Sequence, residues 1–200
     1  TRVTYNMNFG NPEIWASAIT ALGAVAVAWL TIRYSKRTKC DPIREDAAQS
    51  VNVYAALEYT LSELDADRVY VLQFHNGGHY YSGRGQQKFS CTHEVVEEGI
   101  SAEHLNSQDH RISTCHSYIQ ELIDADKFSY SDVNKIDDSG FLRILDHKGV
   151  KSILNVPIKT LNGKMIGILG VDYVKHSTEI KEDQYRFIKR QSRIIAGYLV

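Results

Sequence analysis

The chain contains 200 residues and carries a formal net charge of −1 at pH 7, from 23 basic and 24 acidic side chains. This balance lacks the basic excess of nucleic-acid-binding proteins, so we expect no nucleic-acid partner. The three cysteines, Cys40, Cys91 and Cys115, do not form the closely spaced framework of small secreted domains, which indicates reduced thiols.

The first patterned segment runs from Ile14 to Ile32 and contains no charged residue. About 19 helical residues span roughly 28 Å, close to the hydrocarbon thickness of a bilayer. Trp15 and Trp29 lie near the two ends, where amphipathic rings favour the membrane interface. We therefore predict a single transmembrane helix over residues 14–32, after a short tail over residues 1–13. A buried helix of a soluble core and a cleaved signal peptide are the alternatives.

Basic residues lie mainly on the C-terminal side of this apolar segment. Only Arg2 precedes it, and those that follow it are Arg33, Lys36, Arg37, Lys39 and Arg44. Lysine and arginine near a transmembrane end tend to stay in the cytoplasm. We therefore predict a basic hinge over residues 33–42 and a single-pass membrane protein with a cytoplasmic soluble part and the lipid bilayer as a partner.

Small side chains recur at every fourth position of the apolar segment, at Ala16, Thr20, Ala24 and Ala28. Small residues let helices approach closely in lipid, which favours a homo-oligomer. An alanine-rich anchor without a partner is the alternative.

A helix predicted over residues 43–64 carries apolar residues at alternating spacings of three and four. These are Tyr54, Leu57, Leu61 and Leu64. Such a seam is either an interface between two subunits or the face that packs on the domain.

Beyond residue 42 we predict one α+β domain over residues 43–200 with an antiparallel sheet. Strands are expected where β-branched and aromatic residues cluster, and helices where apolar residues recur every three or four positions. His75–Gly78 predicts a turn, and Asn162–Gly163 predicts a hairpin turn. The expected strands are 69–74, 79–82, 88–96, 128–133, 150–158 and 165–174, and the later helices are 101–124, 140–147 and 181–200.

Two segments resemble the GAF domain family. Gly149–Tyr173, with the sequence GVKSILNVPIKTLNGKMIGILGVDY, and the amphipathic segment after it are similar to the final hairpin and helix of that family. Asp65–Gly78 resembles its opening strand, so the resemblance covers about residues 43–200. It implies a sheet with flanking helices, a small-molecule pocket on the sheet face opposite the first and last helices, and dimers through those two helices.

The same resemblance does not imply a covalently bound bilin. Bilin-binding members attach the chromophore through a cysteine in the helix before the segment that corresponds to Gly149–Ser152. In this chain that helix, Phe141–Leu145, contains no cysteine, although a Cys115–His116 pair occurs elsewhere. We therefore predict no cofactor.

The segment from Phe74 to Lys88 concentrates glycine, histidine, tyrosine and arginine, which suit an anionic or planar ligand. An exposed hairpin tip is the alternative. Cys91 and His93 lie two positions apart on a predicted strand, so we expect them to share a face. The predicted ligand-binding residues are His75, Asn76, His79, Tyr80, Tyr81, Arg84, Cys91 and His93.

The histidines and cysteines of this region lack the paired spacing of zinc sites, so we predict no metal ion. A Cys–His hydrolase needs a thiolate and an imidazole that meet, which side chains two apart on a strand seldom do, so we predict no enzymatic activity. The predicted function is a membrane-anchored, dimeric GAF-like sensory, regulatory or ligand-binding module. The single apolar helix and His79–Ser82 also resemble single-span phage holins, which gives the alternative of a lysis protein acting through its membrane helix.

Overall fold

The computed structural model describes residues 12–38 and 41–200. The chain divides between Asp46 and Ala47 into two compact units. In the first unit, helix α1 spans Pro12–Thr38. The predicted transmembrane segment is therefore helical, and the same helix continues through most of the stretch predicted as a hinge. Nearly all of the predicted N-terminal tail lies outside the described residues.

Helix α1 contains a stretch, Trp15–Tyr34, that is long and apolar enough to cross a membrane. Its mean hydropathy is 1.7, and none of it is buried within the structure. A signal sequence near an N-terminus meets the same criterion of length and composition, so the membrane anchor and its orientation remain predictions.

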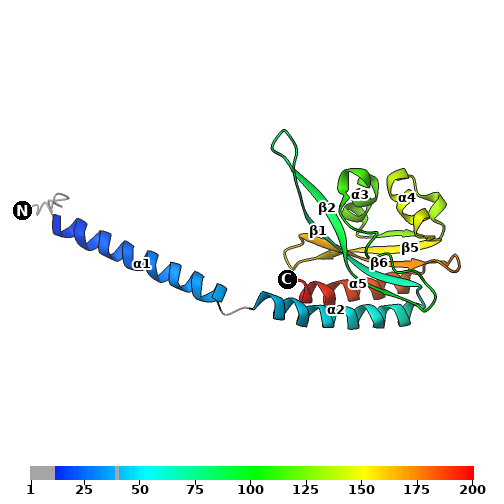
Figure 1. Cartoon of the computed structure of the whole chain (residues 1–200), viewed down its shortest axis with the longest axis horizontal. Helices are drawn as coiled ribbons and strands as arrows, with labels where there is room; N and C mark the ends of the chain where they lie inside the picture. The colour runs from blue at the N-terminus through cyan, green and yellow to red at the C-terminus, as the bar shows by residue number, and fades with distance from the viewer. Residues whose placement is uncertain (1–11, 39–40) are drawn as a thin grey trace, which may run out of the picture. The chain divides into compact units, whose positions relative to one another are not determined.

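The second unit has three layers built on a six-stranded antiparallel sheet with the strand order β3-β2-β1-β6-β5-β4. Helices α2 and α5 cover one face of the sheet, and helices α3 and α4 lie on the other (Figure 1). The α+β prediction with an antiparallel sheet is confirmed.

The strands are β1 (Arg68–His79), β2 (Gly85–Val96), β3 (His110–Arg111), β4 (Phe128–Tyr130), β5 (Ser152–Lys159) and β6 (Met165–Tyr173). The helices are α2 (Pro42–Leu64), α3 (His116–Ala125), α4 (Ser139–His147) and α5 (Glu182–Tyr198), with short 3₁₀ turns η1 (Ile112–Thr114) and η2 (Val133–Lys135).

Alternation along strand β1 separates two hydrophobic cores, because successive side chains of a strand point to opposite faces. Val69 and Val71 pack against α2 and α5, whereas Tyr70 and Leu72 belong to the core under α3 and α4. Both faces of the central strands are therefore buried.

Helix α2 uses its apolar seam to pack on the sheet. Leu57 is fully buried and Leu64 is 6% exposed, and Val53 and Thr60 complete the buried face. Leu57 and Leu64 of the predicted seam are thus part of the domain core, whereas Leu61 is half-buried and Tyr54 is 38% exposed. A substitution such as Leu57→Asp would therefore test folding rather than subunit contact.

The predicted turn at His75–Gly78 is wrong, because strand β1 continues to His79. The register moves from Asn76↔Gln87 to His79↔Gly85, so the glycines lie at an irregularity of the ladder. A Cβ on Gly77 would meet the Lys88 side chain at 2.6 Å. Glycine is used here for a close cross-strand approach and not for the turn.

The helix predicted over residues 101–124 is shorter than expected, since α3 begins at His116. The residues before it form a loop that the Glu94 carboxylate holds against the sheet. Glu94 Oε2 accepts hydrogen bonds from the backbone N–H groups of Glu103 and His104, both at 2.8 Å. A side chain nine or ten positions earlier in the chain therefore satisfies backbone N–H groups of this loop, which helical periodicity does not reveal.

The C-terminal half agrees with the sequence prediction. Helix α4, strands β5 and β6 and helix α5 each begin and end within about two residues of the expected bounds. Gly163 has a φ of 79° in the connection between β5 and β6, as the Asn-Gly turn predicts.

We expect residues 42–200 to fold without α1, because neither hydrophobic core contains a residue of that helix. The fragment should be soluble and unfold in one cooperative transition in urea, followed by circular dichroism. A fragment that starts at Asp65 lacks Val53 and Leu57 and should not fold. An aggregated or non-cooperative product from residues 42–200 would contradict the expectation.

Candidate functional site

The segment predicted to bind a ligand forms the β1–β2 hairpin, which projects from the sheet (Figure 1). Its tip is closed by a hydrogen bond from Tyr80 N to Arg84 O at 2.8 Å. The Arg84 guanidinium lies 5.2 Å from the centre of the Tyr80 ring, and Tyr81 is fully exposed. His79 is exposed as well, and Asn76 accepts a hydrogen bond from the Gln87 amide.

Nearer the sheet, the hairpin and the residue that precedes β3 bring four polar side chains together. We call this set the hairpin cluster: His75, Lys88, Ser90 and Asp109. His75 Nε2 lies 2.8 Å from Ser90 Oγ, which also accepts a hydrogen bond from Asp109 N at 2.8 Å. Lys88 Nζ lies 3.0 Å from Asp109 Oδ1 and holds the pKa of that carboxyl below its usual range. Only His75 of this cluster was predicted from the sequence.

Cys91 and His93 lie on opposite faces of β2, so the expectation that they share a face is wrong. The register shifts between Val71↔His93 and Leu72↔Cys91, which inserts Thr92 as an extra residue. His93 faces α2, where its Nε2 lies 3.2 Å from Ser50 Oγ. Cys91 belongs to the opposite core. A bulge of one residue therefore places these two predicted ligand-binding residues on opposite faces of the sheet.

Aromatic rings fill the core between the sheet and helices α3 and α4. Tyr118 and Phe141 stack with ring centres 3.7 Å apart and planes at 6°, and Phe128 meets both rings edge to face. All three side chains are buried. In the family that the sequence resembles, this face carries the ligand pocket, whereas here large side chains occupy the space beneath the two helices.

A buried polar network begins at the Tyr118 hydroxyl and extends across the sheet to Arg68 at the start of β1. It consists of Arg68, Tyr70, Glu94, Tyr118, Asn155 and Asp172. The Tyr70 hydroxyl contacts Asn155 at 3.2 Å and Asp172 at 3.1 Å, and the Asn155 amide donates to the Tyr118 hydroxyl at 2.7 Å. The network joins the four strands β1, β2, β5 and β6 to helix α3.

Arg68 is the only cation of this network and has no exposed surface. Its guanidinium donates to Asp172 at 3.0 Å and to the Ser101 carbonyl at 2.9 Å, and Glu94 lies 3.5 Å from Nε. Burial raises the pKa of the Asp172 carboxyl, and Arg68 opposes that shift. Burial likewise raises the pKa of Glu94. Arg68 is thus the main source of charge compensation for the two carboxylates, and the Lys148 ammonium, 5.6 Å from the centre of the Tyr70 ring, adds a smaller one.

Sequence reasoning did not assign a role to this network. Its members occupy positions within apolar strands, and Tyr70 and Asp172 read as ordinary alternation in YVLQF and GVDYV. The available signal was Arg68 at the start of an apolar strand, because a charged residue on a buried strand needs a partner.

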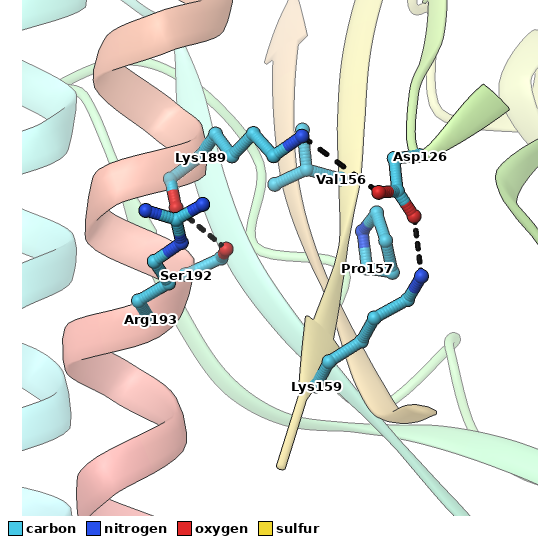
Figure 2. Close-up of a pocket in the computed structure, with 7 residues that line it drawn as sticks. All are labelled: Asp126, Val156, Pro157, Lys159, Lys189, Ser192 and Arg193. Carbon is cyan, nitrogen blue, oxygen red and sulfur yellow. Dashed lines mark hydrogen bonds and ion pairs between the residues drawn. The ribbon is translucent and has the colours of Figure 1, made fainter. Parts of the chain in front are cut away.

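Grooves also lie outside the hairpin, and two of them are formed by described residues. The groove in Figure 2, between β5 and α5, has a volume of about 120 Å³. The second, of about 180 Å³, includes Asp65, Asp67, Glu97 and Lys175. Two of its carboxylates are engaged, since Asp67 accepts hydrogen bonds from the backbone of Val174 and Lys175, and Glu97 pairs with the Lys175 ammonium. Neither groove is lined by residues of the hairpin tip.

Among the described residues, no group of three or more histidines, cysteines and acids is arranged to hold a metal ion. The predicted ligand residues that remain accessible are the hairpin ones, His75, Asn76, His79, Tyr80, Tyr81 and Arg84. Their role as ligand contacts stays a prediction.

We expect Cys91 and Cys115 to be unreactive in the native protein. Burial raises the pKa of both thiols to about 12, so on the order of one molecule in ten thousand carries a thiolate at pH 8. In a Cys40→Ser variant, iodoacetamide at pH 8 should add no label by intact mass spectrometry, and two labels after denaturation. Rapid native labelling of either thiol would contradict this expectation.

A search of curated proteins gives no match. Solved structures give many, including the blue-light-absorbing form of the Thermosynechococcus elongatus PixJ GAF domain, with a TM-score of 0.64 and 15% identity over 80% of this chain and 89% of that one. The phycoerythrobilin-bound GAF domain of a cyanobacterial phytochrome has a TM-score of 0.61 and 18% identity over 78% and 88%.

The GAF domain region of a putative membrane protein from Geobacter sulfurreducens matches with a TM-score of 0.59 and 12% identity, over 80% of this chain and 98% of that one. At these identities the likeness shows the fold alone. The comparisons give no support to the resemblance to phage holins. A sequence model of the GAF domain matches residues 51–198, and the chain therefore belongs to the GAF domain family.

Proposed function

We propose that the chain is a membrane-anchored, non-catalytic sensory module that acts as a dimer and binds a small-molecule ligand at its hairpin. The observation that carries the proposal is a GAF domain preceded by an apolar helix with no buried surface. An exposed apolar stretch of this length is costly in water and is accommodated by a bilayer.

The outer surface of α2 and α5 supports the dimer. Val51 is 68% exposed, Tyr59 is 51% exposed and Ile194 is 43% exposed. Tyr59 also meets the Phe187 ring at 5.7 Å, which joins the two helices into one apolar strip. Aromatic and aliphatic side chains exposed together favour burial against a second copy.

The hairpin supports ligand binding because it presents accessible hydrogen-bonding groups on a rigid two-stranded frame. The similar structures include one with bound phycoerythrobilin. Covalent bilin attachment does not form part of the proposal, since Cys91 and Cys115 are buried and their pKa values are raised to about 12.

The geometry of the hairpin cluster supports a non-catalytic role. In a catalytic triad the carboxylate orients the ring nitrogen of histidine that does not face serine. Here Ser90 and Asp109 both approach the same nitrogen, His75 Nε2, at 2.8 and 3.9 Å. The carboxylate pairs instead with Lys88, so the arrangement does not activate the serine.

Protease protection in intact cells tests the anchor. The full chain should remain in the membrane fraction after salt extraction, and its GAF domain should be digested only when the cells are opened. Digestion of the GAF domain in intact cells would exclude a cytoplasmic sensor and favour the lysis alternative. Recovery in the soluble fraction would exclude the anchor.

Light scattering of the full chain in detergent tests the dimer. Ile194→Glu should halve the measured protein mass, because it places a charge in the apolar strip. Ile123→Glu is the matched control, since Ile123 is 51% exposed on α3, on the opposite face of the sheet. A monomeric starting protein, or equal effects of both variants, would contradict the proposed interface.

A further inference from the structure

The groove between β5 and α5 is lined by three cationic side chains and one carboxylate, and two of the cations approach the carboxylate (Figure 2). It exists because β4 pairs with β5 only at Ile153–Asn155, which leaves the rest of β5 without a neighbour on that side. Val156 and Pro157 form its apolar wall. The lining residues are Asp126, Val156, Pro157, Lys159, Lys189, Ser192 and Arg193.

The carboxylate of Asp126 serves both lysines. It is hydrogen-bonded to the Lys159 ammonium, and its second oxygen lies 3.7 Å from Lys189 Nζ. The hydrogen bond from Lys159 lowers the pKa of Asp126, so this group is a carboxylate throughout the physiological range. One negative charge is therefore shared between two positive charges.

Arg193 adds a third positive charge without compensation. Within the described part of the chain, its guanidinium has no ion pair or hydrogen bond. Arg193 follows Lys189 by one helical turn, and like charges at this spacing destabilise a helix. The ionisable groups of the groove thus carry a net charge of about +2.

We infer that this groove binds a small anion of the phosphate class, held by the Arg193 guanidinium and the two lysine ammonium groups. A guanidinium donates two parallel hydrogen bonds to a phosphate, and an ammonium adds a point charge. Ligand pockets for larger molecules have volumes of about 300–1,000 Å³, so a groove of about 120 Å³ suits a phosphate group and not a chromophore.

This site is separate from the hairpin, so its test does not depend on the proposed function. Two sources supply the same chemistry, namely free phosphate and the phosphate of a lipid headgroup. The purified full chain in nonionic detergent is titrated with inorganic phosphate and, separately, with a short-chain phosphatidic acid in the same micelles. Calorimetry measures the dissociation constant of each probe, and the tighter probe identifies the source.

Arg193→Gln should weaken binding of the tighter probe by about tenfold, which corresponds to the loss of one charge-assisted contact. Arg186→Gln is the matched control on the same helix, because Arg186 is 77% exposed and pairs only with Glu182 at 3.7 Å among the described residues. It should change the affinity by less than about twofold, as for an exposed charge outside the site.

Asp126→Asn distinguishes an anion-binding site from a cluster of ion pairs that only stabilises the fold. It removes the carboxylate that competes with the anion for both lysines, so binding should become tighter even though the domain loses two ion pairs. Absence of saturable binding of either probe at millimolar concentration would overturn the inference. Equal losses in Arg193→Gln and Arg186→Gln would overturn it as well.

Discussion

Arg68→Met should lower the free energy of unfolding by about 3–5 kcal/mol, because removing one partner of a buried ion pair leaves an uncompensated charge. Arg68 has no exposed surface and holds both Asp172 and Glu94. Methionine fills part of the space but offers no donor to Asp172 or to the Ser101 carbonyl.

The loss should depend on pH. Burial already raises the pKa of Asp172 and Glu94 in the folded protein, and loss of the guanidinium raises both further. A carboxyl whose folded pKa is raised destabilises the fold as the pH increases from its unfolded pKa through its folded pKa. The difference between wild type and variant in urea unfolding should therefore be smaller at pH 5 than at pH 8.

Arg84→Met is the control for this substitution. Arg84 is exposed at the hairpin tip, where a change of this kind costs about 0.5 kcal/mol or less. Adding Asp172→Asn to Arg68→Met should recover part of the lost stability, since it removes one of the two unpaired charges. A loss below about 1 kcal/mol for Arg68→Met at pH 8 would show that the network is not an ionic core.

The sequence was sufficient for the elements whose signals are local. Asn162–Gly163 between two apolar runs marks one hairpin, and the amphipathic pattern of residues 181–200 predicts the last helix. Both features agree with the structure. They depend on residues within a few positions of one another, which is the range over which patterns are informative.

The β1–β2 hairpin was predicted less well because Gly77 and Gly78 lie within strand β1, and the turn is made further along, at Tyr80–Arg84. Gly77 lies against the side chain of Lys88, a contact between two strands that only the register reveals. The extra residue at Thr92 likewise reverses the expected relation between Cys91 and His93. A one-residue change of register moves every later side chain to the other face of the sheet. The alternation of a strand sequence alone therefore cannot show which face such ligand-binding side chains occupy.

The candidate sites depend on contacts that are even more distant in sequence. Arg68 meets Asp172 across 104 positions, and Lys159 meets Asp126 across 33. Each residue type is unremarkable where it stands in the sequence. The anion groove in particular needs the end of α3, the edge of β5 and one side of α5 at the same place, which follows from the strand order and not from any motif.

Gly140→Ala should destabilise the domain by about 1–3 kcal/mol, as overpacking of a core does. A Cβ at this position would lie 2.1 Å from the carbonyl oxygen of Thr114 and 3.3 Å from its methyl group. The first contact is to backbone, so a rotamer change cannot relieve it, and the start of α4 must move away from η1.

That movement would disturb the Asp138 side chain, which accepts backbone hydrogen bonds from both α4 and α3. Asp138 accepts hydrogen bonds from the backbone N–H groups of Gly140 and Phe141 at the start of α4, and from Tyr118 in α3. Displacing α4 separates these donors and disturbs the stacked rings of Tyr118 and Phe141. The near-UV circular dichroism of the folded variant should therefore change together with its unfolding midpoint.

Gly197→Ala is the control, and we expect it to change the free energy of unfolding in the opposite direction. Gly197 lies near the end of α5, and an added Cβ there meets no atom within 4 Å. Alanine should therefore stabilise the helix by up to about 1 kcal/mol through its higher helix propensity. Urea unfolding of both variants separates the contact at Gly140 from the general effect of replacing glycine in a helix. If Gly140→Ala were neutral or stabilising, α4 would not be fixed against Thr114, and the aromatic core would be free to open beneath it.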